Sequence, residues 1–286
     1  MTNTWLINAE ELHASQKDNI VIFDCRFSLA NPKMGETLYS QGHIPGAHHL
    51  SMETDLSGPK GLHGGRHPLP DVQQFAFRMR QCGVNQNSLI IAYDNNRFAG
   101  SARLWWLLGY LGHHKVKILD GGLPAWLAAG FMLTKEKTPT TNSGNFKPTE
   151  NLNLTVTAEW VRSNITNRQV TLIDSREAPR YLGHEEPIDP IAGHIPGAVN
   201  APWQQVTNEQ GFINPIELQQ KIWQILPIAS QPVVYCGSGV TACVNLLSLS
   251  LAGIDCAKLY SGSWSDWCSY PANPVEPPHQ KPLSLS

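Results

Sequence analysis

The six-residue sequence GHIPGA stands at residues 42–47 and recurs without change at residues 193–198. A second pair of stretches keeps nearly the same step, 150 residues instead of 151, since VIFDCR at residues 21–26 precedes the first copy and TLIDSR at residues 171–176 precedes the second. An identity of this length, in register with a neighbouring pattern, indicates an internal duplication. The chain therefore contains two copies of one domain, each of about 130 residues.

The composition between the two copies is that of a linker. Residues 135–153 are rich in Thr, Asn, Pro, Gly and Lys and hold few large apolar side chains, which is typical of a connection that runs over the surface. The sequence thus predicts a first domain at residues 1–134, a linker at residues 135–155 and a second domain at residues 156–286.

Each copy alternates short apolar runs with helical patterns. In the second copy, residues 170–173 and 232–235 are β-branched or aromatic, as buried parallel strands are. Residues 216–226 and 242–251 carry apolar side chains at helical spacing. Strands that alternate with helices predict an α/β fold, in which a parallel sheet has helices on both faces. The duplication predicts this fold twice.

Bulk composition narrows the classes of partner. The chain has 286 residues, of which 41% are hydrophobic and 15% charged, and its formal net charge is -2. This balance gives no electrostatic reason to expect nucleic acid or a membrane as partner. We find no signal-peptide pattern and no apolar run near the roughly 18–20 residues that span a bilayer. Six cysteines without a C-x-x-C pair fit neither a disulfide scaffold nor a zinc site. We expect a cytoplasmic protein.

The stretch VVYCGSGVTA at residues 233–242 is the one most suited to chemistry. A strand ends just before Cys236, a loop with Gly237 and Gly239 follows, and a helix begins near Thr241. In open α/β sheets, ligands bind beyond the carboxyl ends of the strands. Glycines let successive N–H groups turn toward one atom, and the helix N-terminus adds partial positive charge. Such a loop favours a cysteine thiolate.

A cysteine phosphatase would use a similar loop. Phosphatases of this kind place an arginine after five intervening residues, where it grips the phosphate by a bidentate pair. That position holds Ala242 in this chain, so phosphatase activity is disfavoured.

With these residues identified, the chain resembles the tandem-domain rhodanese superfamily over nearly its whole length. The loop CGSGVT at residues 236–241 resembles the active loop of 3-mercaptopyruvate sulfurtransferases. Thiosulfate-specific members of the superfamily typically carry two basic residues after the cysteine, where this chain has Gly237 and Ser238. Thiosulfate is a dianion that benefits from such cations, whereas mercaptopyruvate has one carboxylate that is held elsewhere.

The resemblance implies different roles for the two halves. Asp94 occupies the cysteine position of the first half, and a carboxylate cannot become a persulfide. The first half should therefore be catalytically silent and form one wall of the cleft. A serine–histidine–aspartate relay maps onto Ser238, His67 and Asp55. His63 is an alternative to His67, because loop length varies in the superfamily.

The resemblance also implies how the substrate is held. Arg180 corresponds to the arginine that binds the substrate carboxylate by a bidentate pair. The mercaptopyruvate enzymes usually carry a second arginine shortly after a Glu-Pro dipeptide, where this chain has Ile188 and Asp189. We expect Arg103 or Arg66 to substitute for it. The remaining substrate contacts are expected from the loop residues Gly237, Gly239, Val240 and Thr241.

Some charged residues are expected to serve the fold. The Asp-x-Arg pairs, Asp24 with Arg26 and Asp174 with Arg176, occur in both halves, one of which has no cysteine. They are predicted to be structural ion pairs, and the histidine of each GHIPGA copy is predicted to be structural for the same reason.

The implied activity is a two-step sulfur transfer. Cys236 takes sulfur from a small anionic donor, 3-mercaptopyruvate, as a persulfide and passes it to cyanide, a thiol or thioredoxin. No metal and no organic cofactor is implied. A thiosulfate:cyanide sulfurtransferase is the alternative activity, and a non-catalytic partner-binding or sulfur-sensing module is the alternative class. The intact loop around Cys236 favours an enzyme, since a binding module need not keep it.

Overall fold

The computed structural model describes residues 5–15, 19–139, 143–227 and 230–276. Its first half contains five strands: β1 (Leu6–Ile7), β2 (Ile20–Asp24), β3 (Ala47–His49), β4 (Leu89–Tyr93) and β5 (Val116–Leu119). The second half contains β6 (Thr155–Val156), β7 (Val170–Asp174), β8 (Val199–Asn200), β9 (Gln231–Tyr235) and β10 (Lys258–Tyr260). All strand pairs within each sheet are parallel, with orders β1-β5-β4-β2-β3 and β6-β10-β9-β7-β8. The two orders are equivalent, which confirms the predicted duplication.

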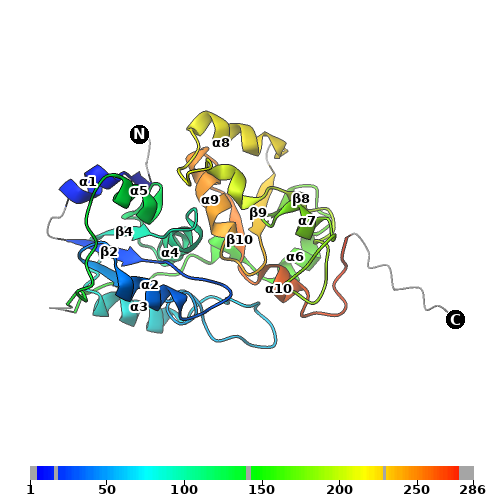
Figure 1. Ribbon diagram of the computed structural model, residues 1–286. Helices are drawn as coiled ribbons and strands as arrows, with labels where there is room; N and C mark the ends of the chain where they lie inside the picture. The colour runs from blue at the N-terminus through cyan, green and yellow to red at the C-terminus, as the bar shows by residue number, and fades with distance from the viewer. Residues whose placement is uncertain (1–4, 16–18, 140–142, 228–229, 277–286) are drawn as a thin grey trace.

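Helices cover both faces of each sheet (Figure 1). In the first half they are α1 (Ala9–Ala14), α2 (Met34–Gln41), α3 (Val72–Gln81), α4 (Ala99–Tyr110) and α5 (Gly122–Ala128). In the second half they are α6 (Ala158–Asn164), α7 (Ala178–Tyr181), α8 (Ile216–Ile222), α9 (Ala242–Leu251) and α10 (Ser263–Trp267), with short 3₁₀ turns at Leu152–Leu154, Trp203–Val206 and Trp223–Ile225. Both faces of β2 are buried, because successive side chains point to opposite faces of the sheet: Phe23 clusters with residues of α3 and α4, and Ile22 with residues of α1 and α5.

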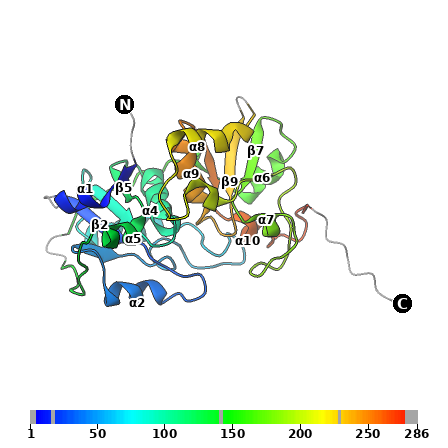
Figure 2. The same ribbon diagram turned by 45° about the horizontal axis from the view of Figure 1, so that its top comes forward.

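The two halves meet along α4 and α9. These helices pack against each other, and one apolar cluster continues from the first sheet through both helices to the second sheet. Figures 1 and 2 show the two helices side by side between the sheets. Each of them directly follows the central strand of its own half, β4 or β9. The interface therefore brings the loop after β9 close to the first half.

The histidines of the two GHIPGA copies make the same contacts. His43 stacks on Tyr39 with ring centroids 3.7 Å apart, and its Nδ1 lies 2.8 Å from the Tyr39 carbonyl oxygen. His194 stacks on Tyr181 at 3.8 Å, and its Nδ1 lies 2.7 Å from the Tyr181 carbonyl oxygen. Both rings are buried, so their structural role is confirmed.

The Asp-x-Arg pairs hold these same segments. Arg26 donates to Asp24 at 2.5 Å and to the carbonyl of the first glycine of GHIPGA at 2.8 Å. Arg176 donates to Asp174 at 2.5 Å and to the equivalent glycine carbonyl at 2.6 Å. All four side chains are buried, which confirms that they are structural ion pairs.

The segment after α5 runs along the first half before it enters the second. Thr134 exchanges two backbone hydrogen bonds with His43, each 2.9 Å long. Further along, Phe146 is buried and its N–H donates to the Val84 carbonyl. These contacts attach the expected linker to the first half. Within the portion of the chain that the structure describes, no helix combines the length and apolar character needed to cross a membrane.

Candidate active site

Cys236 lies directly after β9, at the carboxyl end of the central strand. Its Sγ accepts a hydrogen bond from the N–H of Gly239 at 3.1 Å, and its own N–H donates to Ser263 Oγ at 3.1 Å. Gly239 has φ +79°, and a Cβ added there would stand 2.2 Å from the Ser261 carbonyl oxygen. Only glycine allows this turn, which points the Gly239 N–H at the sulfur. Cys236 is 2% exposed, so little water competes for it.

A cavity of about 750 Å³ opens over the cysteine between the two halves. Cys236, Ser238 and Arg180 line it from the second half, as the sequence predicts. The loop residues Gly237, Val240 and Thr241 also border it, whereas Gly239 lies behind the sulfur and does not. The first half contributes residues 27–30 and 95–96 together with Arg66. The cavity is therefore formed by both halves, in agreement with the predicted cleft.

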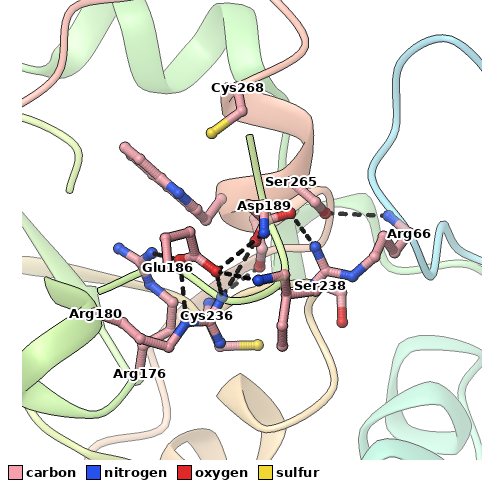
Figure 3. Close-up of polar contacts among 12 residues, drawn as sticks. Arg66, Arg176, Arg180, Glu186, Asp189, Cys236, Ser238, Ser265 and Cys268 are labelled. Atoms are coloured by element: carbon pink, nitrogen blue, oxygen red, sulfur yellow. Dashed lines mark hydrogen bonds and ion pairs between the residues drawn. The ribbon is translucent and has the colours of Figure 1, made fainter. Parts of the chain in front are cut away.

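Two guanidinium groups stand beside the loop. A Cβ added at Gly237 would lie 2.9 Å from Arg66 Nη2 and 3.5 Å from both terminal nitrogens of Arg180. Arg180 donates to Glu186 at 2.6 Å and to Asp189 at 3.2 Å, and Arg66 is ion-paired with Asp189 from the other side (Figure 3). Glycine at position 237 leaves the room that both cations need to approach the cysteine.

The pKa values of the two carboxylates that pair with these arginines, Glu186 and Asp189, are shifted in opposite directions. Burial alone would raise the pKa of Glu186, but hydrogen bonds from Arg180 and from two backbone N–H groups hold it below the ordinary value. Burial raises the pKa of Asp189, and the nearby Glu186 adds to this, while Arg66 and Arg180 oppose it.

Asp189 forms the ion pair that holds a second arginine, Arg66, at the cavity. Asp189 lies shortly after the Glu-Pro dipeptide, and its carboxylate is ion-paired with Arg66 of the first half. The backbone of Arg66 is fixed as well, because its N–H donates to Ser265 Oγ at 3.1 Å. A second guanidinium is thus present at the cavity, supplied by the loop that follows β3 rather than by the segment after α7.

The structure separates the two candidate histidines. His67 Nδ1 lies 2.8 Å from Ser238 Oγ, and its Nε2 lies 3.3 Å from Glu53 Oε1. Burial lowers the pKa of His67, while the Glu53 carboxylate opposes this shift. His63 is instead exposed and stacks on Tyr270, with ring centroids 4.0 Å apart. His67 is therefore the histidine that contacts the cysteine loop.

Asp55 does not contact His67, so the expected third member of the relay needs correction. Its Oδ2 accepts the N–H of Ser51 at 2.8 Å, and its Oδ1 lies 3.5 Å from Arg78 Nε. The turn at residues 51–56 closes on itself and points this carboxylate toward α3. Glu53, two positions earlier, is the acid that reaches His67. Sequence spacing alone did not distinguish the two carboxylates.

Arg103 is also not where a substrate contact would be. It is 0% exposed in the interior of α4 and does not line the cavity. Its guanidinium donates to the carbonyl oxygens of Gly239 at 3.1 Å and His67 at 3.2 Å, behind the loop. The expectation that Arg103 contacts the substrate is therefore wrong, because its guanidinium is used by backbone carbonyl groups within the protein. Of the two expected substitutes for the second arginine, only Arg66 reaches the cavity.

Fold and loop together define a class of protein. It has two α/β domains of common origin and a cysteine whose sulfur accepts the backbone N–H of Gly239, in a loop beside two guanidinium groups. This arrangement is suited to covalent chemistry on a small anion.

Comparison with known proteins identifies the family. The model of the rhodanese-like domain matches residues 8–129 and 157–270. A probable 3-mercaptopyruvate sulfurtransferase from Pseudomonas aeruginosa is 42% identical over 283 residues, which cover 96% of this chain and 99% of that protein. A putative thiosulfate sulfurtransferase from Mycobacterium tuberculosis is 39% identical over 280 residues, with 94% and 96% covered. The crystal structure of the 3-mercaptopyruvate sulfotransferase SseA from Escherichia coli matches with a TM-score of 0.80 and 32% identity, covering 92% of this chain and 100% of that chain.

The chain therefore belongs to the rhodanese family, with two tandem rhodanese-like domains. It is a sulfurtransferase, the activity that these curated relatives share.

Proposed function

We propose that the chain transfers sulfur from 3-mercaptopyruvate and carries it as a persulfide on Cys236. The observation that supports this most is the position of Cys236, whose sulfur accepts the Gly239 N–H and which lines the same cavity as Arg66 and Arg180. A carboxylate held by those cations would place the thiol of a three-carbon donor within reach of the cysteine.

In this proposal, Arg180 and Arg66 bind the donor carboxylate. Glu186 occupies two nitrogens of Arg180, at 3.0 and 2.6 Å, and leaves Nη1 beside Gly237 for the substrate. Asp189 holds both arginines in place. Their side chains are thus ordered before the donor arrives, which lowers the entropic cost of binding.

The first step forms an S–S bond and breaks a C–S bond. The Cys236 thiolate attacks the donor sulfur, and the electron pair of the C–S bond passes to the pyruvate enolate. The thiol proton leaves through Ser238 and His67, whose Oγ and Nδ1 are 2.8 Å apart, and returns to the enolate carbon. Because burial lowers the pKa of His67, its ring is neutral near pH 7 and can accept this proton. The products are pyruvate and the Cys236 persulfide anion.

The second step returns the cysteine to its thiolate. Cyanide or a small thiol attacks the outer sulfur, the S–S bond breaks, and its electron pair stays on Cys236. A dithiol protein such as thioredoxin is a third acceptor under this proposal. We further propose that the protein acts in the cytoplasm, because six cysteines in 286 residues are too few for a disulfide scaffold of the kind that secreted proteins carry.

Steady-state kinetics with 3-mercaptopyruvate and with thiosulfate, each with cyanide as acceptor, tests the donor. We expect kcat/KM for 3-mercaptopyruvate to exceed that for thiosulfate by about tenfold or more, which corresponds to about 1.4 kcal/mol of transition-state binding. A higher kcat/KM with thiosulfate would contradict the proposed donor and make the chain a thiosulfate sulfurtransferase.

A further inference from the structure

Arg103 is a buried cation whose partners are all neutral. Its N–H groups donate to the carbonyl oxygens of Gly239 at 3.1 Å, His67 at 3.2 Å, Leu56 at 3.3 Å and Pro68 at 3.5 Å. Within the described ranges, no carboxylate lies within ion-pair distance of it. A guanidinium stays charged, and a buried charge without an ionic partner destabilises the folded protein. We therefore infer that Arg103 has a role in the function of the protein.

The acidic groups that act on Arg103 are two thiols. Burial lowers the pKa of Arg103, and the opposing influences come from Cys243 and Cys236. Burial raises the pKa of Cys243 to about 12, so this thiol stays neutral. In the proposed transfer the sulfur of Cys236 carries the negative charge, and the guanidinium of Arg103 would stabilise it.

Arg103 also fixes the residue that holds this sulfur. It donates to the carbonyl of Gly239, whose N–H donates to Cys236 Sγ. The carbonyl and the N–H both belong to Gly239, which has φ +79°. Because Arg103 holds the carbonyl, it also restricts rotation of the N–H that points at the sulfur. The same guanidinium holds the His67 carbonyl, in the loop that presents the imidazole to Ser238. One side chain of the first half therefore supports both parts of the site.

The equivalent position in the other helix shows that this arrangement is one-sided. Arg103 follows Asp94 by nine positions in the first half, and Asn245 follows Cys236 by nine positions in the second. Asn245 is neutral, and its Nδ2 donates within its own half to Ser175 Oγ at 2.8 Å. At this equivalent position, α4, which faces the cysteine loop of the second half, carries a charged residue, whereas α9 carries a neutral one.

We propose that Arg103 is the positioning residue of the transfer site, which orients Gly239 and His67 and supplies positive charge behind the sulfur of Cys236. This inference rests on the proposed role of Cys236 as the sulfur carrier. It does not depend on which donor the enzyme uses.

Alkylation of cysteine by iodoacetamide tests the inference without any sulfur donor. Peptide-level mass spectrometry at neutral pH would follow Cys236, with the exposed Cys256 as internal reference. In Arg103→Met we expect Cys236 to react at about one tenth of its wild-type rate or more slowly still, since the sulfur loses a fixed charge and an oriented N–H. Cys256 should react at its wild-type rate. Arg103→Lys should react at an intermediate rate, because an ammonium restores charge but not the forked geometry.

Arg97→Met is the matched control. Arg97 also crosses to the second half, where it donates to Thr207 Oγ1 at 2.6 Å and to the Gln204 carbonyl at 3.0 Å. Its loss should weaken the interface but leave alkylation of Cys236 within about twofold of wild type. If Arg103→Met alters the Cys236 rate no more than Arg97→Met does, the inference is wrong. If Arg103→Met does not fold, an Arg103→Lys protein that reacts at the wild-type rate contradicts it equally.

Turnover provides the second readout. For folded Arg103→Met we expect kcat to fall by roughly 10²-fold, with KM for the donor within about threefold, because Arg103 does not touch the cavity. A raised KM with unchanged kcat would instead place Arg103 in substrate binding. If the wild type transfers sulfur from neither donor, the proposed function fails, while the alkylation comparison still judges Arg103.

Discussion

The loops after β4 and β9 are built alike, and they differ in what fills them. In the first half, Asp94 places its own carboxylate in the loop, where Oδ2 accepts the N–H groups of Gly100 and Ser101 at 3.0 and 2.8 Å and the Ser101 hydroxyl at 2.7 Å. Its Oδ1 accepts the Asn96 N–H at 2.7 Å. In the second half, the sulfur of Cys236 accepts one N–H at 3.1 Å and faces a cavity.

This difference separates a carboxylate that is bonded within its own loop from a sulfur that borders an open cavity. The Asp94 carboxylate accepts the N–H groups of Asn96, Gly100 and Ser101 and the Ser101 hydroxyl, so these donors are already used within the first half. The surroundings differ in the same sense. Three positions separate Tyr39 from Gly42, whereas twelve separate Tyr181 from Gly193, and this longer segment carries Glu186 and Asp189. The residue before the stacked tyrosine is Leu38 in one half and Arg180 in the other. One duplicated framework thus supports a closed loop and an open one.

The largest expected effect comes from replacing the two equivalent residues separately. Cys236→Ser should lower sulfur transfer by at least about 10³-fold with an unchanged unfolding midpoint, because serine is nearly isosteric but cannot form a persulfide. Asp94→Ala should keep kcat within about twofold per folded molecule and lower the free energy of unfolding by about 3 kcal/mol, since its buried N–H donors lose their acceptor. Steady-state kinetics and urea unfolding measure both. Lost transfer in folded Asp94→Ala would show that the two loops are not independent.

Ser238→Ala should separate the two donors. Turnover of 3-mercaptopyruvate should fall by about 10²-fold, because the donor thiol carries a proton that the Ser238–His67 pair must move. Thiosulfate has no proton on its outer sulfur, so its turnover should fall by less than about threefold. Parallel kinetics with both donors provide the measurement. Equal losses would mean that Ser238 supports the loop rather than the proton transfer.

Arg180→Ala tests whether Arg180 binds the carboxylate of the donor at the loop after β9. Removal of one charge-assisted contact of about 1.5–3 kcal/mol should raise KM for 3-mercaptopyruvate by about tenfold or more. Arg180→Lys should recover part of this loss, because it keeps the charge without the fork. An unchanged KM in Arg180→Ala would assign the donor carboxylate to Arg66 alone.

The smallest expected effect concerns pH. Glu53 raises the pKa of His67 against the larger, lowering effect of burial. Glu53→Gln removes the raising contribution, so the imidazole stays neutral to lower pH, and the acid limb of kcat/KM should move to lower pH. Asp55→Asn is the matched control, because Asp55 contacts Ser51 and Arg78 instead, and it should leave the limb in place. The opposite result, with a shift in Asp55→Asn only, would restore Asp55 as the relay acid.

Local and repeated features of this protein were predictable from its sequence. The duplicated GHIPGA and the strand–loop–helix pattern around Cys236 predict the fold and the reactive position, because both depend on neighbouring residues. Contacts that depend on how a loop closes or on how the two halves pack were not predictable. Whether Glu53 or Asp55 reaches His67 depends on how a single turn closes. The position of Arg103 depends on the packing of α4 against α9, which residue spacing within one helix does not encode.

The central claim is that Cys236 alone carries the sulfur. Mass spectrometry of the protein after incubation with 3-mercaptopyruvate in the absence of an acceptor, with alkylation to trap persulfides, tests it most directly. We predict one additional sulfur atom on the peptide that contains Cys236 and none on the peptides of the other five cysteines, and cyanide should remove it as thiocyanate. An additional sulfur on a different cysteine, or rapid turnover without any sulfur on Cys236, would contradict the account.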